Sequence, residues 1–166
     1  MTQAARLGVV LLCHAQLDIA ARMARIWVEG GARVAVHVDA KAPRSAFARM
    51  KADLADLPEV VFSRRRQCDW GRFNLVAATQ DAAELLLERF PDRTHVFLAS
   101  GSCLPLRPVR DLAAYLGAHP DRDHIESVTA SDVGWTVGGL NEERFTLFYP
   151  LDWRRHRWAF DRLVEL

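Results

Sequence analysis

The chain has 166 residues, of which 50% are hydrophobic and 26% are charged, a composition typical of one soluble globular domain. Its formal net charge of +1 gives no support for a nucleic-acid tail or a strongly acidic partner. The three cysteines form no Cys-x-x-Cys pair or Cys/His cluster, which argues against a disulfide framework and a structural zinc site. We therefore expect a reduced, cytoplasmic protein. Peripheral association of the full-length protein with the inner face of a membrane stays open.

The first part of the chain alternates short apolar runs with amphipathic stretches. The apolar runs predict three buried strands, at Leu7–Cys13, Arg33–Asp39 and Glu59–Ser63. The stretches between them predict two helices. The first covers Leu17–Val28 and ends at Gly30-Gly31, and the second runs from Pro43 to Leu57, before Pro58.

The alternation continues after a polar loop at Arg64–Arg72. A long helix follows and ends at Pro91, and its predicted inner face contains Leu75, Thr79, Ala83, Leu86 and Phe90. A fourth strand is predicted at His95–Ala99, with a turn at Ser100–Ser102 after it. A helix then begins at Pro108, with an inner face formed by Val109, Leu112, Ala113 and Leu116. His124–Val128 is the predicted fifth strand.

Strands that alternate with helices predict an α/β fold, with a Rossmann-like, mostly parallel sheet and helices on both faces. In such sheets ligands bind outside the carboxyl ends of the strands. Here those ends carry His14, His37–Asp39, the loop 64–71 and Ser100–Ser102. We divide the chain at residues 1–128 and 129–166. Because it stops within a helical pattern, we expect a C-terminally truncated fragment.

Two of these ends carry residues suited to a nucleotide. Asp39 can accept hydrogen bonds from a ribose or a base edge, although an ordinary turn aspartate is equally open. Trp70 can stack on a flat ring and Gly71 lets a ligand approach the backbone, or Trp70 can pin the loop as a core residue. The preceding run, Arg64-Arg65-Arg66, is interpreted as a solvated loop.

The turn after the fourth strand bears on anion and metal binding. Ser100-Gly101-Ser102 can offer N–H groups to an anion or be a plain turn, and its lack of carboxylates gives no strong Mg²⁺ or Mn²⁺ site. Asp121-Arg122-Asp123 precedes the fifth strand, away from the ligand edge, so we predict no metal. No G-x-G-x-x-G follows the first strand, which disfavours a nicotinamide-dependent oxidoreductase. His14 and His37 lie near the same edge, where structural histidines are the commoner case.

Three segments then occur in a fixed order: His37–Lys41 (HVDAK), Trp70–Thr79 (WGRFNLVAAT) and Phe97–Pro108 (FLASGSCLPLRP). Together they resemble the core-2/I-branching β-1,6-N-acetylglucosaminyltransferases and the related peptide O-xylosyltransferases of glycosyltransferase family 14. The resemblance covers about residues 7–127. It departs from the family pattern at Arg72, Asn74 and Cys103-Leu104.

The resemblance implies a GT-A fold and an inverting transfer of N-acetylglucosamine or xylose from a UDP-sugar to an acceptor hydroxyl, without a metal or other cofactor. Residues 1–128 would then be the donor-binding half, and residues 129–166 the start of the acceptor and catalytic half. The implied substrate-binding residues are His14, Asp39, Lys41, Trp70, Gly71, Ser100, Gly101 and Arg107. Asp39 would contact the uridine, Trp70 the nucleotide, and Ser100, Gly101 and Arg107 the sugar side. The family's catalytic glutamate is expected beyond Leu166, so no catalytic residue is assigned. A non-catalytic, degenerate nucleotide-binding or protein-interaction module remains the alternative.

Overall fold

The computed structural model describes residues 4–69 and 72–125, together with Thr129, His156, Trp158 and Arg162. The chain divides into two compact units, Met1–Arg122 and Asp123–Leu166, and the elements below belong to the first. They are, in chain order, β1 (Leu7–Cys13), α1 (Leu17–Glu29), β2 (Arg33–Val38), α2 (Arg44–Asp53), β3 (Val60–Phe62), α3 (Phe73–Arg89), β4 (His95–Ser100) and α4 (Val109–Gly117).

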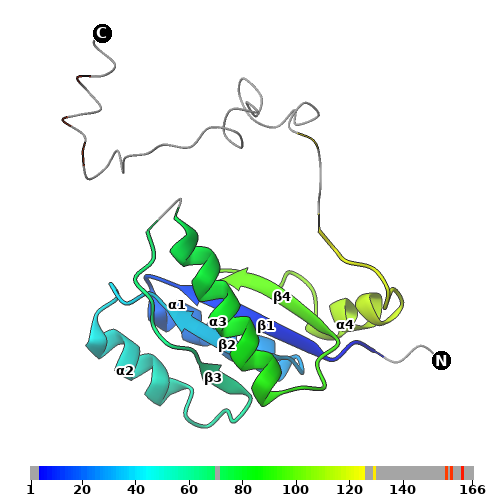
Figure 1. Ribbon diagram of the computed structural model, residues 1–166. Helices are drawn as coiled ribbons and strands as arrows, with labels where there is room; N and C mark the ends of the chain where they lie inside the picture. The colour runs from blue at the N-terminus through cyan, green and yellow to red at the C-terminus, as the bar shows by residue number, and fades with distance from the viewer. Residues whose placement is uncertain are drawn as a thin grey trace. The chain divides into compact units, whose positions relative to one another are not determined.

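The four strands form one parallel sheet in the order β3-β2-β1-β4 (Figure 1). The chain moves outward from β1 through β2 to β3, and then returns to the other side of β1 for β4. The strand order therefore reverses between β1 and β4, which makes this the topological switch point where open α/β sheets bind ligands. The predicted Rossmann-like parallel sheet is confirmed.

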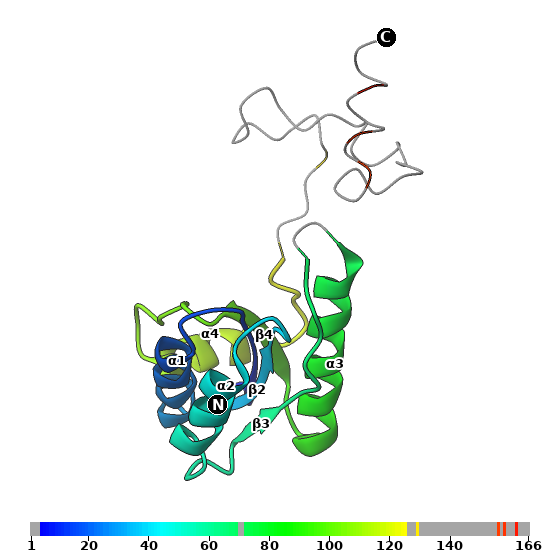
Figure 2. The same cartoon turned by 90° about the vertical axis from the view of Figure 1, so that its left-hand side faces the viewer.

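Helices cover both faces of the sheet, as predicted. Figure 2 shows α1, α2 and α4 on one side and α3 on the other. Alternate residues of β2 pack against the helices on opposite faces of the sheet, because successive side chains of a strand point to opposite faces. Val34 and Val36 pack in the core with α1 and α2, whereas Ala35 packs in the smaller core with Ala82 and Leu86 of α3.

The inner face of α3 matches the prediction at Leu86, which is buried, and at Ala83 and Phe90, which pack against the same small core, but it differs at Leu75. The buried residues of this helix are Ala78, Ala82 and Leu86, while Leu75 is 39% exposed. A Cβ added at Gly8 of β1 would lie 2.6 Å from Leu86 Cδ2, so Leu86 fills the space that the glycine leaves. Small residues let the helix approach the sheet closely, and the prediction had favoured the larger apolar side chain of Leu75.

Two smaller predictions also need correction. Helix α2 ends at Asp53 rather than running to Leu57, and turns follow in which the Leu57 N–H donates to Leu54 O at 3.1 Å. Of the predicted fifth strand, His124 and Ile125 are not in a strand, and residues 126–128 lie outside the described residues. In the described part of the chain no helix is both long enough and apolar enough to cross a membrane.

Candidate functional site

The segments that follow β2 and β4 are both attached to the end of β1. The Gly101 N–H donates to Leu12 O at 2.8 Å, and the Asp39 N–H donates to Cys13 O at 2.8 Å. These bonds place two of the predicted ligand-binding segments on either side of β1 at the carboxyl edge of the sheet.

A pocket of about 110 Å³ lies at the switch point. It is lined by Leu12, Cys13, His14, Ala15, Gln16, Ile19, Ser100, Gly101 and Ser102, and we call it the switch-point pocket. The structure thus brings three predicted site residues, His14, Ser100 and Gly101, to one place. The volume is small beside the roughly 300–1,000 Å³ of ordinary ligand pockets, so it suits a phosphate group or a sugar hydroxyl rather than a whole nucleotide.

The backbone around this pocket is tightly constrained. Gln16 has φ 48° and ψ 51°, a left-handed conformation that is uncommon outside glycine and that occurs preferentially at functional sites. Helix α1 begins directly after it without a side-chain cap, which leaves N–H groups of its first turn available to a ligand. A Cβ at Gly101 would lie 3.0 Å from Cys13 Sγ and 3.1 Å from Ala20 Cβ, so glycine lets the turn approach β1 and α1 more closely than a larger residue could without moving its neighbours.

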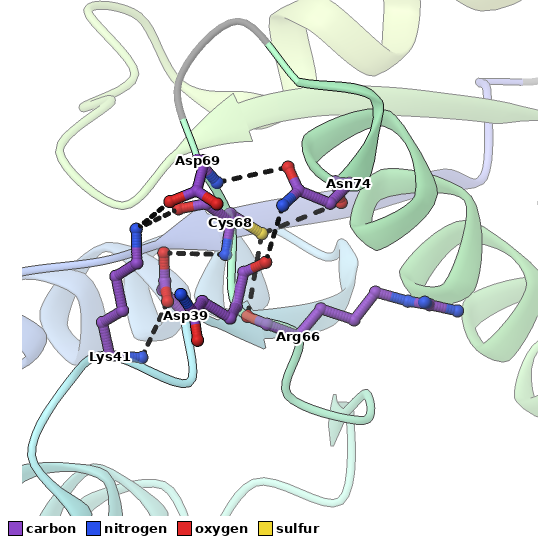
Figure 3. A network of polar contacts seen from close by, with 7 residues as sticks. Asp39, Lys41, Arg66, Cys68, Asp69 and Asn74 are labelled. Atoms are coloured by element: carbon purple, nitrogen blue, oxygen red, sulfur yellow. Dashed lines mark hydrogen bonds and ion pairs between the residues drawn. The ribbon is translucent and has the colours of Figure 1, made fainter. Parts of the chain in front are cut away.

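Asp39 forms a turn at the end of β2 (Figure 3). Only 6% of the residue is exposed. Its Oδ1 accepts the Lys41 N–H at 2.8 Å, and its Oδ2 accepts the Cys68 N–H at 3.3 Å. Asp39 is therefore a turn aspartate, which is one of the two interpretations that the sequence left open; the other is an acceptor for a ribose or a base. A carboxylate oxygen can accept more than one hydrogen bond, so these contacts leave room for a ligand donor.

Residues 66–69 form a segment, here called the clamped loop, that is held from two sides. Lys41 Nζ donates to Cys68 O at 2.9 Å and to Asp69 Oδ1 at 2.5 Å, and the bond to Lys41 lowers the pKa of Asp69. From α3, Asn74 Nδ2 donates to Gln67 O at 2.9 Å, while Asn74 Oδ1 accepts the Asp69 N–H at 3.2 Å. The next two residues in the chain, Trp70 and Gly71, lie outside the described residues.

The arginine run before this loop is not simply solvated, so that interpretation is wrong for Arg65 and Arg66. Arg65 Nη2 donates to Asp39 O at 2.8 Å and to Ala42 O at 2.5 Å, which ties this arginine to the turn that follows β2. Arg66 binds Asp81 of α3 through two hydrogen bonds, Nε to Oδ2 at 2.5 Å and Nη2 to Oδ1 at 2.9 Å. This contact lowers the pKa of Asp81.

Arg107 lies apart from the switch-point pocket. It lines a larger hollow of about 610 Å³, whose walls include Trp27, Phe97, Leu106 and Tyr115. Within the described residues, no three His, Cys, Asp or Glu side chains are grouped so that they could hold a metal ion.

Sequence reasoning missed the partners of Asp39 and the unusual conformation at the pocket. The Asp-x-Lys spacing does carry a signal, because aspartate often accepts the N–H two residues on. The role of Cys68 depends on a contact with Asp39, 29 residues earlier, and has no local signal. Asn74 binds Gln67 and Asp69, which lie just before it in the chain, and the sequence reasoning did not use that proximity. Nothing in the sequence marks Gln16 as left-handed.

The pocket, the Asp39 turn and the clamped loop all fall within a single family match. The model of the core-2/I-branching enzyme family matches residues 10–151. The chain belongs to this family. Core-2/I-branching enzymes are glycosyltransferases, which move a sugar from a nucleotide-sugar donor to a glycan acceptor, and the parallel sheet fits the GT-A-like fold expected of one. A search of curated proteins found no match to this core-2/I-branching chain.

Proposed function

We propose that this chain is the donor-nucleotide-binding part of an inverting, metal-independent glycosyltransferase. The donor would be a UDP-sugar carrying N-acetylglucosamine or xylose, and the acceptor a hydroxyl group. The observation that carries the proposal is the attachment of the Asp39 turn and the Ser100–Ser102 turn to adjacent residues of β1, Cys13 and Leu12. This attachment supports a continuous donor site along one edge of the sheet.

Each part of that edge suits a different part of a nucleotide-sugar. The Asp39 carboxylate, already fixed by two backbone N–H groups, accepts a hydrogen bond from the base or ribose, with Lys41 beside it. The switch-point pocket takes a small polar group against Ser100, Gly101 and the exposed His14.

The remaining proposed contacts rest on the resemblance. Trp70 would stack on the base, next to Gly71, where the backbone can be approached closely. Arg107 has the least support among the proposed contacts, because it lines a different hollow.

The chemistry would be a direct displacement. The acceptor oxygen attacks the anomeric carbon, its proton passes to a carboxylate base, and UDP leaves from the opposite face. Positive groups stabilise the diphosphate as it departs. Metal independence is proposed because the end of β4 carries hydroxyls at Ser100 and Ser102, where a metal-dependent enzyme needs carboxylates. Alone, the chain is expected to bind UDP weakly and to show little transfer.

The cysteine pattern supports a reduced, cytoplasmic setting for this chemistry. Peripheral membrane association of the full-length protein is proposed only as an open alternative.

A thermal-shift panel tests the nucleotide class. UDP, GDP, ADP and NAD are compared at equal concentrations, first with EDTA and then with Mn²⁺. A ligand that binds the native state raises the melting temperature by mass action, so UDP is expected to raise it in both conditions and NAD in neither. Stabilisation by NAD but not by UDP would contradict the proposal. No shift with any nucleotide would favour the non-catalytic interaction module. UDP-N-acetylglucosamine and UDP-xylose, tested next, discriminate the donor sugars.

A further inference from the structure

His37 is a buried histidine that the proposed chemistry does not use. It lies on β2 and is only 2% exposed. Its Nε2 accepts the backbone N–H of Arg66 at 3.0 Å. A ring nitrogen that accepts an N–H carries no proton of its own, so this contact requires the neutral imidazole.

The backbone N–H and C=O groups of Arg66 bind residues that precede and follow Asp39 in the sequence. The Arg66 N–H binds His37, two residues before Asp39, and Arg66 O accepts the Ala40 N–H at 2.9 Å, one residue after it. Two residues further along the clamped loop, the Cys68 N–H donates to Asp39 Oδ2. The position of Arg66, together with the contacts from Lys41 and Asn74, thus sets where the loop meets the carboxylate; Figure 3 draws this network.

We propose that His37 is a positioning residue for the donor nucleotide: its neutral imidazole holds the Arg66 peptide, which sets the Cys68 N–H against the Asp39 carboxylate. The inference rests on the proposed function, since it assumes that the nucleotide binds at Asp39. Protonation would give Nε2 a hydrogen that faces the Arg66 N–H. Two donors cannot bond each other, so the loop would lose this attachment and nucleotide binding would weaken in acid.

The charged groups around His37 act in both directions. Burial is the largest effect and lowers the pKa of His37. Asp39 on the same segment and Asp81 on α3 favour the protonated ring, while Arg65 and Arg66 before and within the clamped loop oppose it. The neutral form therefore dominates at neutral pH, and the loss of binding is expected only on the acid side.

The test is a calorimetric titration with UDP between about pH 8 and pH 5.5. Wild type is compared with His37→Gln, whose side-chain oxygen can accept the Arg66 N–H but does not titrate. The ratio of their dissociation constants cancels the ionisation of UDP itself. The matched control is His95→Gln at the start of β4, the opposite end of the sheet from the site.

We expect the ratio of wild-type to His37→Gln dissociation constants to be constant at neutral pH and above. As the pH falls towards and past the lowered pKa of His37 the ratio should rise, with tenfold per pH unit as the limiting slope in stronger acid. His95→Gln should follow wild type. A ratio that stays constant while both proteins bind UDP would overturn this inference and leave the proposed function standing. A folded wild type that binds no UDP at pH 8 would overturn both.

A second measurement uses wild type alone, so it remains possible even if His37→Gln does not fold. In wild type, the Arg66 amide resonance should shift with pH in step with the His37 ring resonances. An Arg66 amide that does not respond while His37 titrates would equally overturn the inference.

Discussion

Replacing Asp39 with asparagine tests the turn at the end of β2 directly. The substitution keeps the size of the side chain and one oxygen, which can still accept the Lys41 N–H that Oδ1 binds at 2.8 Å. The new amide NH₂ then faces the Cys68 N–H, whose bond to Oδ2 is 3.3 Å long. Rotating the amide only exchanges which N–H loses its acceptor.

A hydrogen bond to a charged group contributes about 1.5–3 kcal/mol, and the length of the Cys68 bond favours the lower end. We therefore expect Asp39→Asn to lower the free energy of unfolding by about 1.5 kcal/mol, roughly a tenfold fall in the ratio of folded to unfolded protein. Urea unfolding followed by circular dichroism measures this difference. Asp121→Asn, at an exposed turn, removes the same charge and serves as the control. If Asp39→Asn lies within about 0.5 kcal/mol of this control, the turn does not depend on the carboxylate and the reasoning is refuted.

Three further predictions concern the same edge of the sheet. Gly101→Ala should lower the free energy of unfolding by about 1–3 kcal/mol, because the new methyl group would lie 3.0 Å from Cys13 Sγ and 3.1 Å from Ala20 Cβ. Urea titrations measure this change, and an unchanged free energy of unfolding would mean that the turn can move away from these neighbours. Since folding lowers the pKa of His37 below its ordinary 6.5, the unfolded chain binds this proton more readily, so stability should fall as the pH drops below about 6.5. His37→Gln should lack that part of the fall in unfolding titrations, and identical pH dependence in both proteins would contradict this. Burial raises the pKa of the Cys13 thiol to about 12. A thiol reagent should therefore modify the exposed Cys103 in the native protein and Cys13 only after unfolding. Labelling followed by peptide mapping checks the order, and reaction of Cys13 before Cys103 would be inconsistent with the structure.

The strands could be predicted well because buried parallel strands leave a strong local pattern. The apolar run Leu7–Cys13 coincides with β1, and the predicted limits of β2 and β4 differ from the structure by one residue. Proline and glycine positions also predicted where helices begin and end, as at Pro108, which directly precedes α4. These features depend on neighbouring residues alone.

Spacing predicted the inner face of α3 only in part, because the residues that are buried depend on what the helix packs against. It identified Leu86 but not the small buried residues Ala78 and Ala82. Leu86 is buried because Gly8, 78 positions earlier in the chain, leaves space for it. Leu75 has a suitable position on the same helix and remains exposed.

The site shows the same division between local and distant contacts. That His14, Ser100 and Gly101 meet in one pocket follows from the rule that parallel strands end at one edge. The bonds of Asp39 and His37 to Cys68 and Arg66 join segments 29 residues apart, and no local pattern specifies them. Arg107 was grouped with the sugar-side residues on the basis of its motif, whereas in the structure it lines another hollow.

The most direct test of the proposed function is a calorimetric titration of the chain with UDP, first in EDTA and then with Mn²⁺, using wild type, Asp39→Asn and the Asp121→Asn control. The account predicts that wild type and the control bind UDP equally well in both conditions. It also predicts that Asp39→Asn binds at least about tenfold more weakly, since one charged acceptor is lost. Binding that requires Mn²⁺, or that is unchanged in Asp39→Asn, would contradict it.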